Sequence, residues 1–234
     1  MTIKMLDLCC GGGIAADGYM RAAFELGITL RITGVDIADH SKIYPYKFIQ
    51  ADALLYSKKY AKYFDFIHAS PPCQEYSKST VMFRNQGKKY PDILENLRKI
   101  LLDKNDCPIV IENVPGAPIR PDIRLRGDMF GLKTLKLRWF ELHNIFIMQP
   151  GIPKKTGSVI EGDYCSIFGS GSYRTNKTNA FPKFIETSVN EMWRVAMDIH
   201  RPVPTSSIAQ AIPPAYTKYI GLQIFEQLIK KSNS

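Results

Sequence analysis

An apolar segment that runs into two adjacent prolines is the feature that most limits how this chain can fold. Residues 64–68 form a short apolar run that is typical of a buried strand. Pro71 and Pro72 come shortly after it, and regular structure must end there because proline restricts its own backbone and the residue before it. Cys73 therefore stands in a rigid loop at a strand end, where functional side chains are common. The alternative is a turn with a buried cysteine, since free cysteine usually packs as a small apolar residue.

The N-terminal segment has the order strand, glycine turn, helix. Residues 3–8 are predicted to form a strand, and the glycines at positions 11–13 follow closely. Residues 15–26 are predicted to form a helix with a core face of Met20, Ala23 and Phe24. In this arrangement backbone N–H groups at the start of the helix can approach a bound ligand. A plain glycine turn is the alternative, so this motif is weak by itself.

Three further predicted strands end in acidic residues, namely Asp36, Asp52 and Glu112. The strands cover residues 31–35, 48–52 and 109–112. The carboxyl ends of parallel strands share one edge of a sheet, and open α/β sheets bind their ligands at that edge. Asp36 follows the glycines by roughly 20 residues and is placed to accept hydrogen bonds from ribose hydroxyls. The same spacing fits a dinucleotide-dependent oxidoreductase, which remains an alternative.

Taken together, these motifs resemble those of the DNA (cytosine-5) methyltransferase family, and most of all its short phage and prophage members. The Pro-Pro-Cys-Gln motif at 71–74 and the Glu-Asn-Val motif at 112–114 resemble the two catalytic motifs of that family. Residues 7–14 resemble its methyl-donor loop, and the resemblance runs from about residue 3 to about residue 225. It implies an α/β, Rossmann-like S-adenosylmethionine-dependent methyltransferase fold. Such a fold has a mostly parallel sheet with helices on both faces, here with a small irregular recognition region.

The resemblance also implies a covalent mechanism. Cys73 would add to carbon-6 of a flipped-out cytosine, because carbon-5 is a poor nucleophile until such an adduct forms. Glu112 would hold or protonate ring N3, and burial would favour its protonated form. Arg138 would hold the target base and is a candidate to raise the thiolate fraction of Cys73. Lys136 stands where the family usually has the first arginine of an Arg-x-Arg motif, so the charge is kept and the planar bidentate contact is lost.

The methyl donor implied by the resemblance is S-adenosylmethionine, with S-adenosylhomocysteine as product. The residues expected to hold it are Asp7, Cys9, Gly11, Gly13, Asp36, Ile37, Asp52, Pro72 and Gln210. Four positions depart from the family pattern. Cys9 replaces a phenylalanine, Ile14 a glycine, Ala209 a glycine and Gln210 an asparagine. These positions touch the donor pocket, so a low affinity for the donor is expected.

Double-stranded DNA is the partner that the resemblance implies. The residues expected to contact it are Gln74, Ser77, Lys78, Arg84, Lys136, Arg174 and Lys177. Residues 78–89 are basic and are predicted to form a mobile lid over the extruded base, with a solvated surface loop as the alternative. Residues 149–189 are predicted to be a small target-recognition insert within a catalytic domain of residues 1–148 and 190–234. A flexible insert is the alternative.

The C-terminal half contains three predicted helices. The first starts after Asp92, and its core face is Ile93, Leu94, Leu97, Ile100 and Leu101. The second is short and covers residues 193–197. The third starts at Pro214, and its buried face is Tyr216, Ile220, Ile224 and Leu228.

The composition indicates the cellular compartment and the kind of binding partner. The chain has 234 residues with a formal net charge of +9, which favours a polyanionic partner. Its five cysteines include no Cys-x-x-Cys pair, so no metal site and no disulfides are expected. No apolar run reaches the roughly 18 residues of a membrane span, and the N-terminus lacks a signal-peptide pattern. We expect a monomer in the reducing cytoplasm of a bacterial or phage-infected cell.

Two further alternatives share most of these features. An RNA cytosine-5 methyltransferase would use the same chemistry, and the basic charge permits it. A non-catalytic DNA-binding relic would explain the departures in the donor pocket. Donor binding argues against the relic, and competition between tRNA and duplex DNA separates the two enzymes.

Overall fold

The computed structural model describes residues 1–103, 105–154, 156–168 and 188–233. Its centre is a seven-stranded sheet with the strand order β3-β2-β1-β4-β5-β7-β6. The first five strands in this order are parallel, whereas β7 runs antiparallel to both of its neighbours. The strands are β1 (Thr2–Leu8), β2 (Thr29–Asp36), β3 (Lys47–Gln50), β4 (Phe66–Ala69), β5 (Ile109–Asn113), β6 (Ile123–Leu125) and β7 (Arg138–His143).

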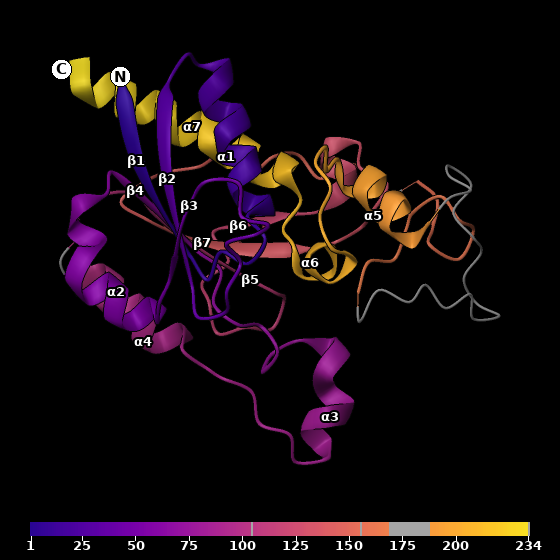
Figure 1. Cartoon of the computed structure of the whole chain (residues 1–234). Coiled ribbons are helices and arrows are strands. Elements are labelled where there is room, and N and C mark those ends of the chain that lie inside the picture. Colours follow the sequence, from indigo (N-terminus) through magenta and orange to yellow (C-terminus); the bar gives the residue numbers. More distant parts are fainter. Residues whose placement is uncertain (104, 155, 169–187, 234) are drawn as a thin grey trace.

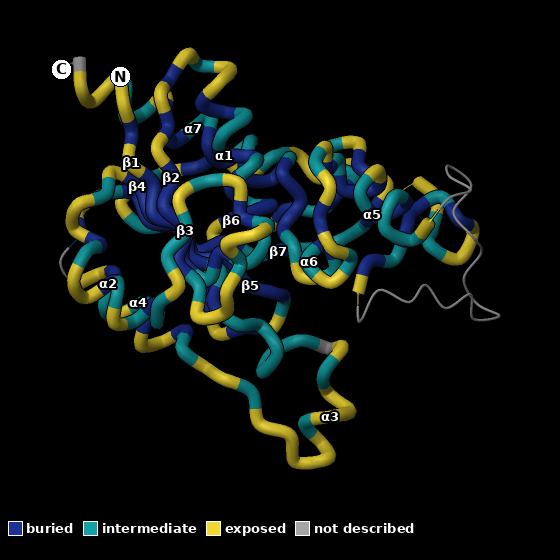
Figure 2. The backbone as a smooth tube through the Cα atoms, in the orientation of Figure 1, coloured by how far each residue is buried: buried dark blue, intermediate teal, exposed yellow. Residues whose placement is uncertain are grey.

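Helices cover both faces of the sheet (Figure 1). The apolar residues of α1 and α7 pack in one hydrophobic cluster against one face, and those of α2 and α4 pack in a second cluster against the other. Figure 2 shows buried residues at the centre of the sheet, where β4 and β5 are buried along their whole length. The predicted α/β arrangement, a mostly parallel sheet with helices on both faces, is confirmed. These helices are α1 (Ile14–Glu25), α2 (Ala53–Tyr60), α4 (Leu94–Asp103) and α7 (Pro214–Asn233).

Two of the predicted helix faces differ in how well they match the structure. In α7, Tyr216, Ile220 and Ile224 are fully buried, as the spacing predicts. In α1, by contrast, Phe24 is 86% exposed, so its assignment to the core was wrong. The helix buries Ala23, as predicted, together with Ala16, Tyr19 and Ala22, because α7 packs against that side and leaves Phe24 outside the contact.

The third predicted strand ends earlier than expected. β3 stops at Gln50, and Asp52 is the N-cap of α2, where its Oδ1 atom accepts a hydrogen bond of 2.9 Å from the N–H of Leu55. An aspartate satisfies the free N–H groups of a first helical turn well, so the local capping geometry fixes this side chain.

The segment predicted as a mobile lid contains regular structure. Residues Lys78–Thr80 form a 3₁₀ turn, η2, and Val81–Asn85 form α3, which lies apart from the sheet in Figure 1. Arg84 Nη1 donates to the carbonyl oxygens of Gln74 at 2.8 Å and Ser77 at 3.1 Å. These bonds tie α3 to the loop that carries Cys73. None of the five residues of α3 is buried, so tertiary packing contributes little to its stability.

A third, smaller apolar cluster lies at the C-terminal side of the chain. It joins α5 (Val189–Met197) and α6 (Thr205–Gln210) to Ile14, Cys165 and Ile167. The described part of the predicted recognition insert contains no helix or strand before Val189, where α5 begins, and Arg174 and Lys177 lie outside the described residues. Within the described ranges, no helix combines the length and the apolar character that a membrane crossing needs.

The close approach of α1 and α7 depends on Gly18. A Cβ atom at this position would overlap with Thr217 Oγ1 and the carbonyl oxygen of Pro214. We expect Gly18→Ala to lower the free energy of unfolding by about 3 kcal/mol, because a backbone contact gives way less easily than a side chain. Urea denaturation measures the effect. Gly151→Ala is the control, since a Cβ atom there meets nothing within 4 Å, and an unchanged midpoint for Gly18→Ala would contradict the prediction.

Candidate active site

One cavity opens at the carboxyl ends of β1, β4 and β5. The methyl-donor loop, the cysteine loop and the end of β5 all contribute to its wall, together with residues of α6. The sheet therefore brings together sequence motifs that are about a hundred residues apart. The predicted site residues on the wall are Asp7, Cys9, Gly11, Pro72, Cys73, Gln74, Glu112, Arg138 and Gln210.

Cys73 is held in a turn directly after β4. Its carbonyl oxygen accepts hydrogen bonds from the N–H groups of Tyr76 at 3.0 Å and Ser77 at 2.9 Å. Burial raises the pKa of the Cys73 thiol and the charge of Glu112 adds to the rise, whereas the charges of Arg138 and Lys136 oppose it. The resting group is therefore a thiol, and nucleophilic attack requires the removal of its proton.

Glu112 and Arg138 form a buried ion pair on adjacent strands. Arg138 Nε lies 2.8 Å from Glu112 Oε1, and both side chains are almost completely buried. Burial raises the pKa of Glu112, while Arg138, Lys136 and a hydrogen bond from Ser70 lower it. Because burial has the largest effect, Glu112 keeps its proton to a higher pH than an exposed glutamate does.

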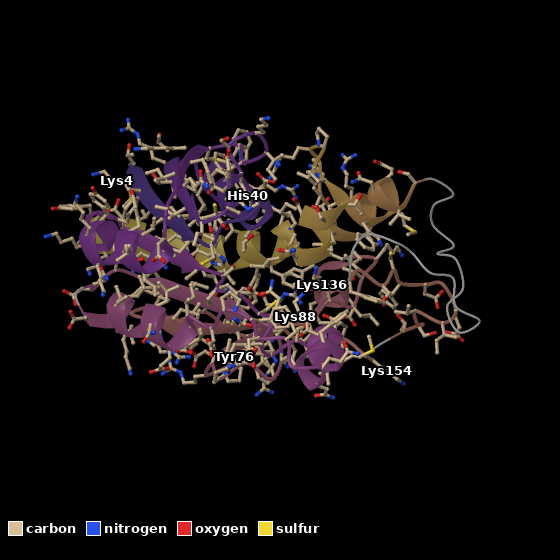
Figure 3. The ribbon with its side chains drawn as sticks, turned by 60° about the horizontal axis from the view of Figure 1, so that its bottom comes forward. Lys4, His40, Tyr76, Lys88, Lys136 and Lys154 are labelled. Atoms are coloured by element: carbon tan, nitrogen blue, oxygen red, sulfur yellow. The ribbon has the colours of Figure 1, made fainter. Side chains whose placement is uncertain are left out.

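Lys136 has an internal contact. Its Nζ atom donates to the carbonyl oxygen of Ala209 at 2.7 Å and lies 3.5 Å from that of Ile208, both near the end of α6. Figure 3 labels it near the middle of the molecule, whereas Lys154 is labelled near the edge. Burial lowers the pKa of Lys136 well below its usual range. The predicted contact with DNA stays a prediction, and here the side chain connects β7 to the wall of the donor pocket.

Asp7 and Asp36 organise the part of the cavity predicted to hold the donor. Asp7 is fully buried; its Oδ2 atom accepts a hydrogen bond of 2.9 Å from the Tyr44 hydroxyl, and its Oδ1 atom has no partner. Asp36 accepts hydrogen bonds of 3.0 Å from the N–H groups of Gly11 and Ala38. Each Asp36 oxygen retains a second lone pair, which a ribose hydroxyl can use.

Four of the predicted donor-binding residues are not part of the cavity wall. Gly13 has a positive φ of 75° and turns the chain into α1, and Asp36 accepts a hydrogen bond from the N–H group of Gly11. Ile37 is 73% exposed, and Asp52 caps α2. Cys9, which does line the cavity, has a φ of 56°. Their roles in donor binding stay predictions.

Several residues that the sequence reasoning missed also contribute to the site. His40, Ser70, Ser206 and Ser207 line the cavity. Arg201 donates to Asp17 at 2.8 Å, to the carbonyl oxygen of Ile43 at 3.0 Å and to that of Gly12, and so fixes the glycine loop. Ser70 had a signal in the sequence, because it stands between a strand and the two prolines. The others come from distant segments and carry no local motif.

The residues predicted to contact DNA lie around this cavity or beyond the described residues. Gln74 lines the cavity and has a buried, unpaired Oε1 atom. Ser77 Oγ lies 2.8 Å from Ser79 Oγ, and Arg84 is occupied by carbonyl groups of its own loop. Lys78 begins η2. Their contacts with a nucleic acid stay predictions.

The fold and the cavity together define a methyltransferase of the Rossmann-like class. The chain belongs to the C-5 cytosine-specific DNA methylase family, whose model matches residues 3–119. That match covers the donor loop, the cysteine loop and the Glu112 motif. A comparison with curated proteins finds no match.

Solved structures give the same fold. The structure of the Entamoeba histolytica methyltransferase EhMeth is similar with a TM-score of 0.61 and 12% identity, over 97% of this chain and 99% of the other. The S. pombe Dnmt2 methyltransferase is similar with a TM-score of 0.64 and 13% identity, over the same shares. At these identities the likeness concerns the fold.

The cofactor of this family is S-adenosylmethionine, and the cavity fits it in two respects. The unpaired Oδ1 atom of Asp7 is a buried acceptor for a cationic ligand. Gly11 and Gly12 leave the wall open where a side chain would project, and a Cβ atom at Gly12 would crowd Ser207. Asp7, the glycine loop and Gln210 are the residues that would hold the cofactor.

Donor binding is expected to depend on the protonation of Asp7. Burial raises the pKa of Asp7 to about 7, and the charges of Asp36 and Asp17 add to the rise, against a hydrogen bond from Tyr44. Asp7 therefore becomes anionic as the pH rises from 6 to 8, and a cationic donor should bind several-fold more tightly. Calorimetric titration measures donor binding by wild type and by Asp7→Asn at both pH values. The protonation of the donor itself affects both proteins alike, so it cancels when their pH dependences are compared. An equal pH dependence in both proteins would contradict the prediction.

Proposed function

We propose that this chain is a DNA (cytosine-5) methyltransferase that acts through a covalent Cys73 adduct assisted by Glu112. The observation that carries the proposal is the shared cavity. Its wall is lined by a cysteine in a rigid loop, by a buried carboxyl group with a raised pKa, and by the glycine loop together with Asp7, whose Oδ1 atom has no partner. Nucleophile, acid and donor site are thus within one crevice, as attack on a cytosine ring requires.

In the proposed mechanism the proton of Cys73 is removed and Sγ forms a bond to carbon-6 of cytosine. The ring electrons then move toward N3, where Glu112 donates its proton or a hydrogen bond, so that no bare negative charge remains. S-adenosylmethionine would supply the methyl group that carbon-5 takes up and would leave as S-adenosylhomocysteine. A base then removes the carbon-5 proton, the carbon–sulfur bond breaks, Cys73 leaves as the thiolate, and any proton held on N3 returns to Glu112.

Arg138 has two effects in this scheme. Its guanidinium group holds the carboxyl group of Glu112 in place at 2.8 Å. It also lowers the pKa of Cys73 and so opposes the effect of burial. A single cation thus favours the thiolate form of the nucleophile while it positions the acid.

Duplex DNA is the proposed substrate, and the target base would have to leave the stack to reach Cys73. The net charge of +9 favours a polyanion, and the matching family model describes DNA methylases. We further propose that residues 149–189 read the target sequence and that the protein acts as a monomer in the cytoplasm. The closeness of α3 to the cysteine loop supports a role of residues 78–89 at the DNA.

The test is the transfer of tritiated methyl groups to duplex DNA, with tRNA offered as a competitor. Label at carbon-5 of cytosine in DNA, undiminished by tRNA, is the expected result. Bisulfite sequencing of DNA from cells that express the protein would then reveal the target sequence. Label that appears only in tRNA would reject DNA as the substrate while retaining the chemistry. Donor binding without label in either polymer would reject the catalytic proposal.

A further inference from the structure

A buried chain of polar side chains leads from α1 to Glu112. The hydroxyl of Tyr19 lies 3.0 Å from Nδ1 of His68, and Nε2 of His68 lies 2.9 Å from Oγ of Ser70. Ser70 and Glu112 both line the cavity, and the side chain of Ser70 lowers the pKa of the Glu112 carboxyl group. Tyr19 and His68 are completely buried and are not part of the cavity wall. The methyl-transfer scheme described above uses neither of them.

The register of the sheet builds this arrangement. Ala69 of β4 pairs with Ile111 of β5, so the next residues, Ser70 and Glu112, follow opposite each other where the two strands end. His68 stands two residues before Ser70 and therefore points to the same face of the sheet. That face is the one that α1 covers, which brings the ring of Tyr19 against the imidazole.

The direction of the hydrogen bonds follows from burial. Burial lowers the pKa of His68 to about 3, so the imidazole is neutral and carries one N–H group. Burial, with smaller contributions from Asp7 and Glu112, raises the pKa of Tyr19, so the phenol keeps its proton. A buried phenol needs an acceptor, and Nδ1 of His68 is at the right distance. The imidazole proton is then on Nε2 and is donated to Ser70 Oγ.

This direction determines what Ser70 can do. Its oxygen accepts the proton of His68 Nε2, and its own proton is left for Glu112. We propose that Tyr19 and His68 are positioning residues for the methyl-transfer reaction, which hold the Ser70 hydroxyl as a fixed hydrogen-bond donor to Glu112. The inference rests on the function proposed above, because it requires Glu112 to handle a proton during the reaction.

The relay of Tyr19, His68 and Ser70 affects the pKa of Glu112 as well as the position of its carboxyl group. Burial raises the pKa of Glu112, and the hydrogen bond from Ser70 opposes the rise. A group that gives up a proton works best when its pKa is near the operating pH, so a limit on the rise is useful. The donor also fixes one side of the carboxyl group, while Arg138 holds it from the other strand.

Other charged groups act on Glu112 independently of the relay. Arg138 on β7 and Lys136 just before that strand both lower its pKa. Cys73 lines the same cavity from the loop after β4, and the charge of Glu112 raises the pKa of its thiol. None of these three is hydrogen-bonded to Tyr19 or His68 among the contacts of the described residues. A change at Tyr19 therefore reports on the relay.

The test is a pH titration of Glu112 in Tyr19→Phe. The titration is monitored by ¹³C NMR on protein labelled at the glutamate side chains. Glu112→Gln identifies the resonance. Without the phenol, His68 can carry its proton on Nδ1 and accept from Ser70, so Glu112 loses its donor. We expect the midpoint of Glu112 to rise by about half a pH unit or more. The high-pH limit of methyl transfer should move in the same direction, which a purely structural role would not produce.

Three further variants sharpen the test. Ser70→Ala should raise the Glu112 midpoint at least as far as Tyr19→Phe, and the double variant should go no further than Ser70→Ala alone, because the relay acts through Ser70. Tyr44→Phe is the matched control. It removes another buried phenol, one that donates to Asp7 instead of His68, and it should leave the Glu112 midpoint unchanged.

An unchanged Glu112 midpoint in Tyr19→Phe would overturn the proposal, and so would additive shifts in the double variant. Thermal melting verifies that each variant is folded. The titration needs no activity, so it tests the relay even if the wild-type protein transfers no methyl group. A failure of the relay and a failure of the proposed function are therefore distinguishable.

Discussion

Cys73→Ser is expected to abolish methyl transfer to cytosine, with a loss of at least about 10³-fold in rate. A serine hydroxyl fits the same turn, but it is a far weaker nucleophile than a thiolate at neutral pH. The cavity wall contains no replacement in a comparable loop, because Cys9 and Cys10 belong to the donor loop and burial raises the pKa of both thiols far above the usual range. Tritium transfer to duplex DNA under single-turnover conditions measures the loss.

Cys107→Ala is the matched control for that experiment. Cys107 is also a free, half-buried cysteine, but it packs against the hydrophobic cluster of α2 and α4 and is not part of the cavity wall. Its replacement should leave the rate within about twofold of wild type. If Cys73→Ser kept a substantial rate, or if both variants lost activity alike, the covalent mechanism would be refuted.

The site was predictable from sequence wherever a local motif carried it. Pro71 and Pro72 end a strand by their own covalent structure, so the loop position of Cys73 follows from the sequence alone. The acidic residues at strand ends give the edge of the sheet, because parallel strands share that edge. These two rules were enough to predict that Cys73 and Glu112 would be near the donor loop.

Contacts between residues that are far apart in the chain could not be predicted from the sequence. His68 looked like part of an apolar run, and only the packing of α1 on the sheet brings Tyr19, 49 residues away, to its ring. Lys136 matched a family position for DNA contact, yet α6 provides carbonyl groups that its ammonium binds. In both cases tertiary packing selects the partner of a polar group, and no periodicity encodes it.

The errors in secondary structure have a similar cause. Phe24 satisfied the helical spacing of an apolar face, but the spacing does not say which side α7 will cover. Residues 78–89 have a loop-like composition, and the hydrogen bonds of Arg84 to its own loop favour the short α3. Local propensity is a weak guide where a few tertiary hydrogen bonds decide the outcome.

Glu112→Gln is expected to reduce methyl transfer by about 10²- to 10⁴-fold, the usual contribution of a general acid. The amide keeps the size of the side chain but has no carboxyl proton. Burial raises the pKa of Glu112, so the wild-type protein should lose activity as the pH rises and the carboxyl group ionises. The residual rate of the variant should not decline at high pH. A pH series of single-turnover rates measures both effects.

Breaking a buried ion pair also costs stability, and a second glutamate separates that effect from catalysis. Glu141 is as deeply buried as Glu112 and lies 2.8 Å from Nη2 of Arg98, away from the cavity. Glu112→Gln should lower the free energy of unfolding by roughly 3 kcal/mol, since it leaves the buried guanidinium group of Arg138 without its counter-charge. Glu141→Gln should also lower it, but by less, because Arg98 keeps its ion pair with Glu95. Only Glu112→Gln should lose the methyl transfer and the decline at high pH. Equal losses of activity in the two variants would mean that Glu112 serves the fold and not the chemistry.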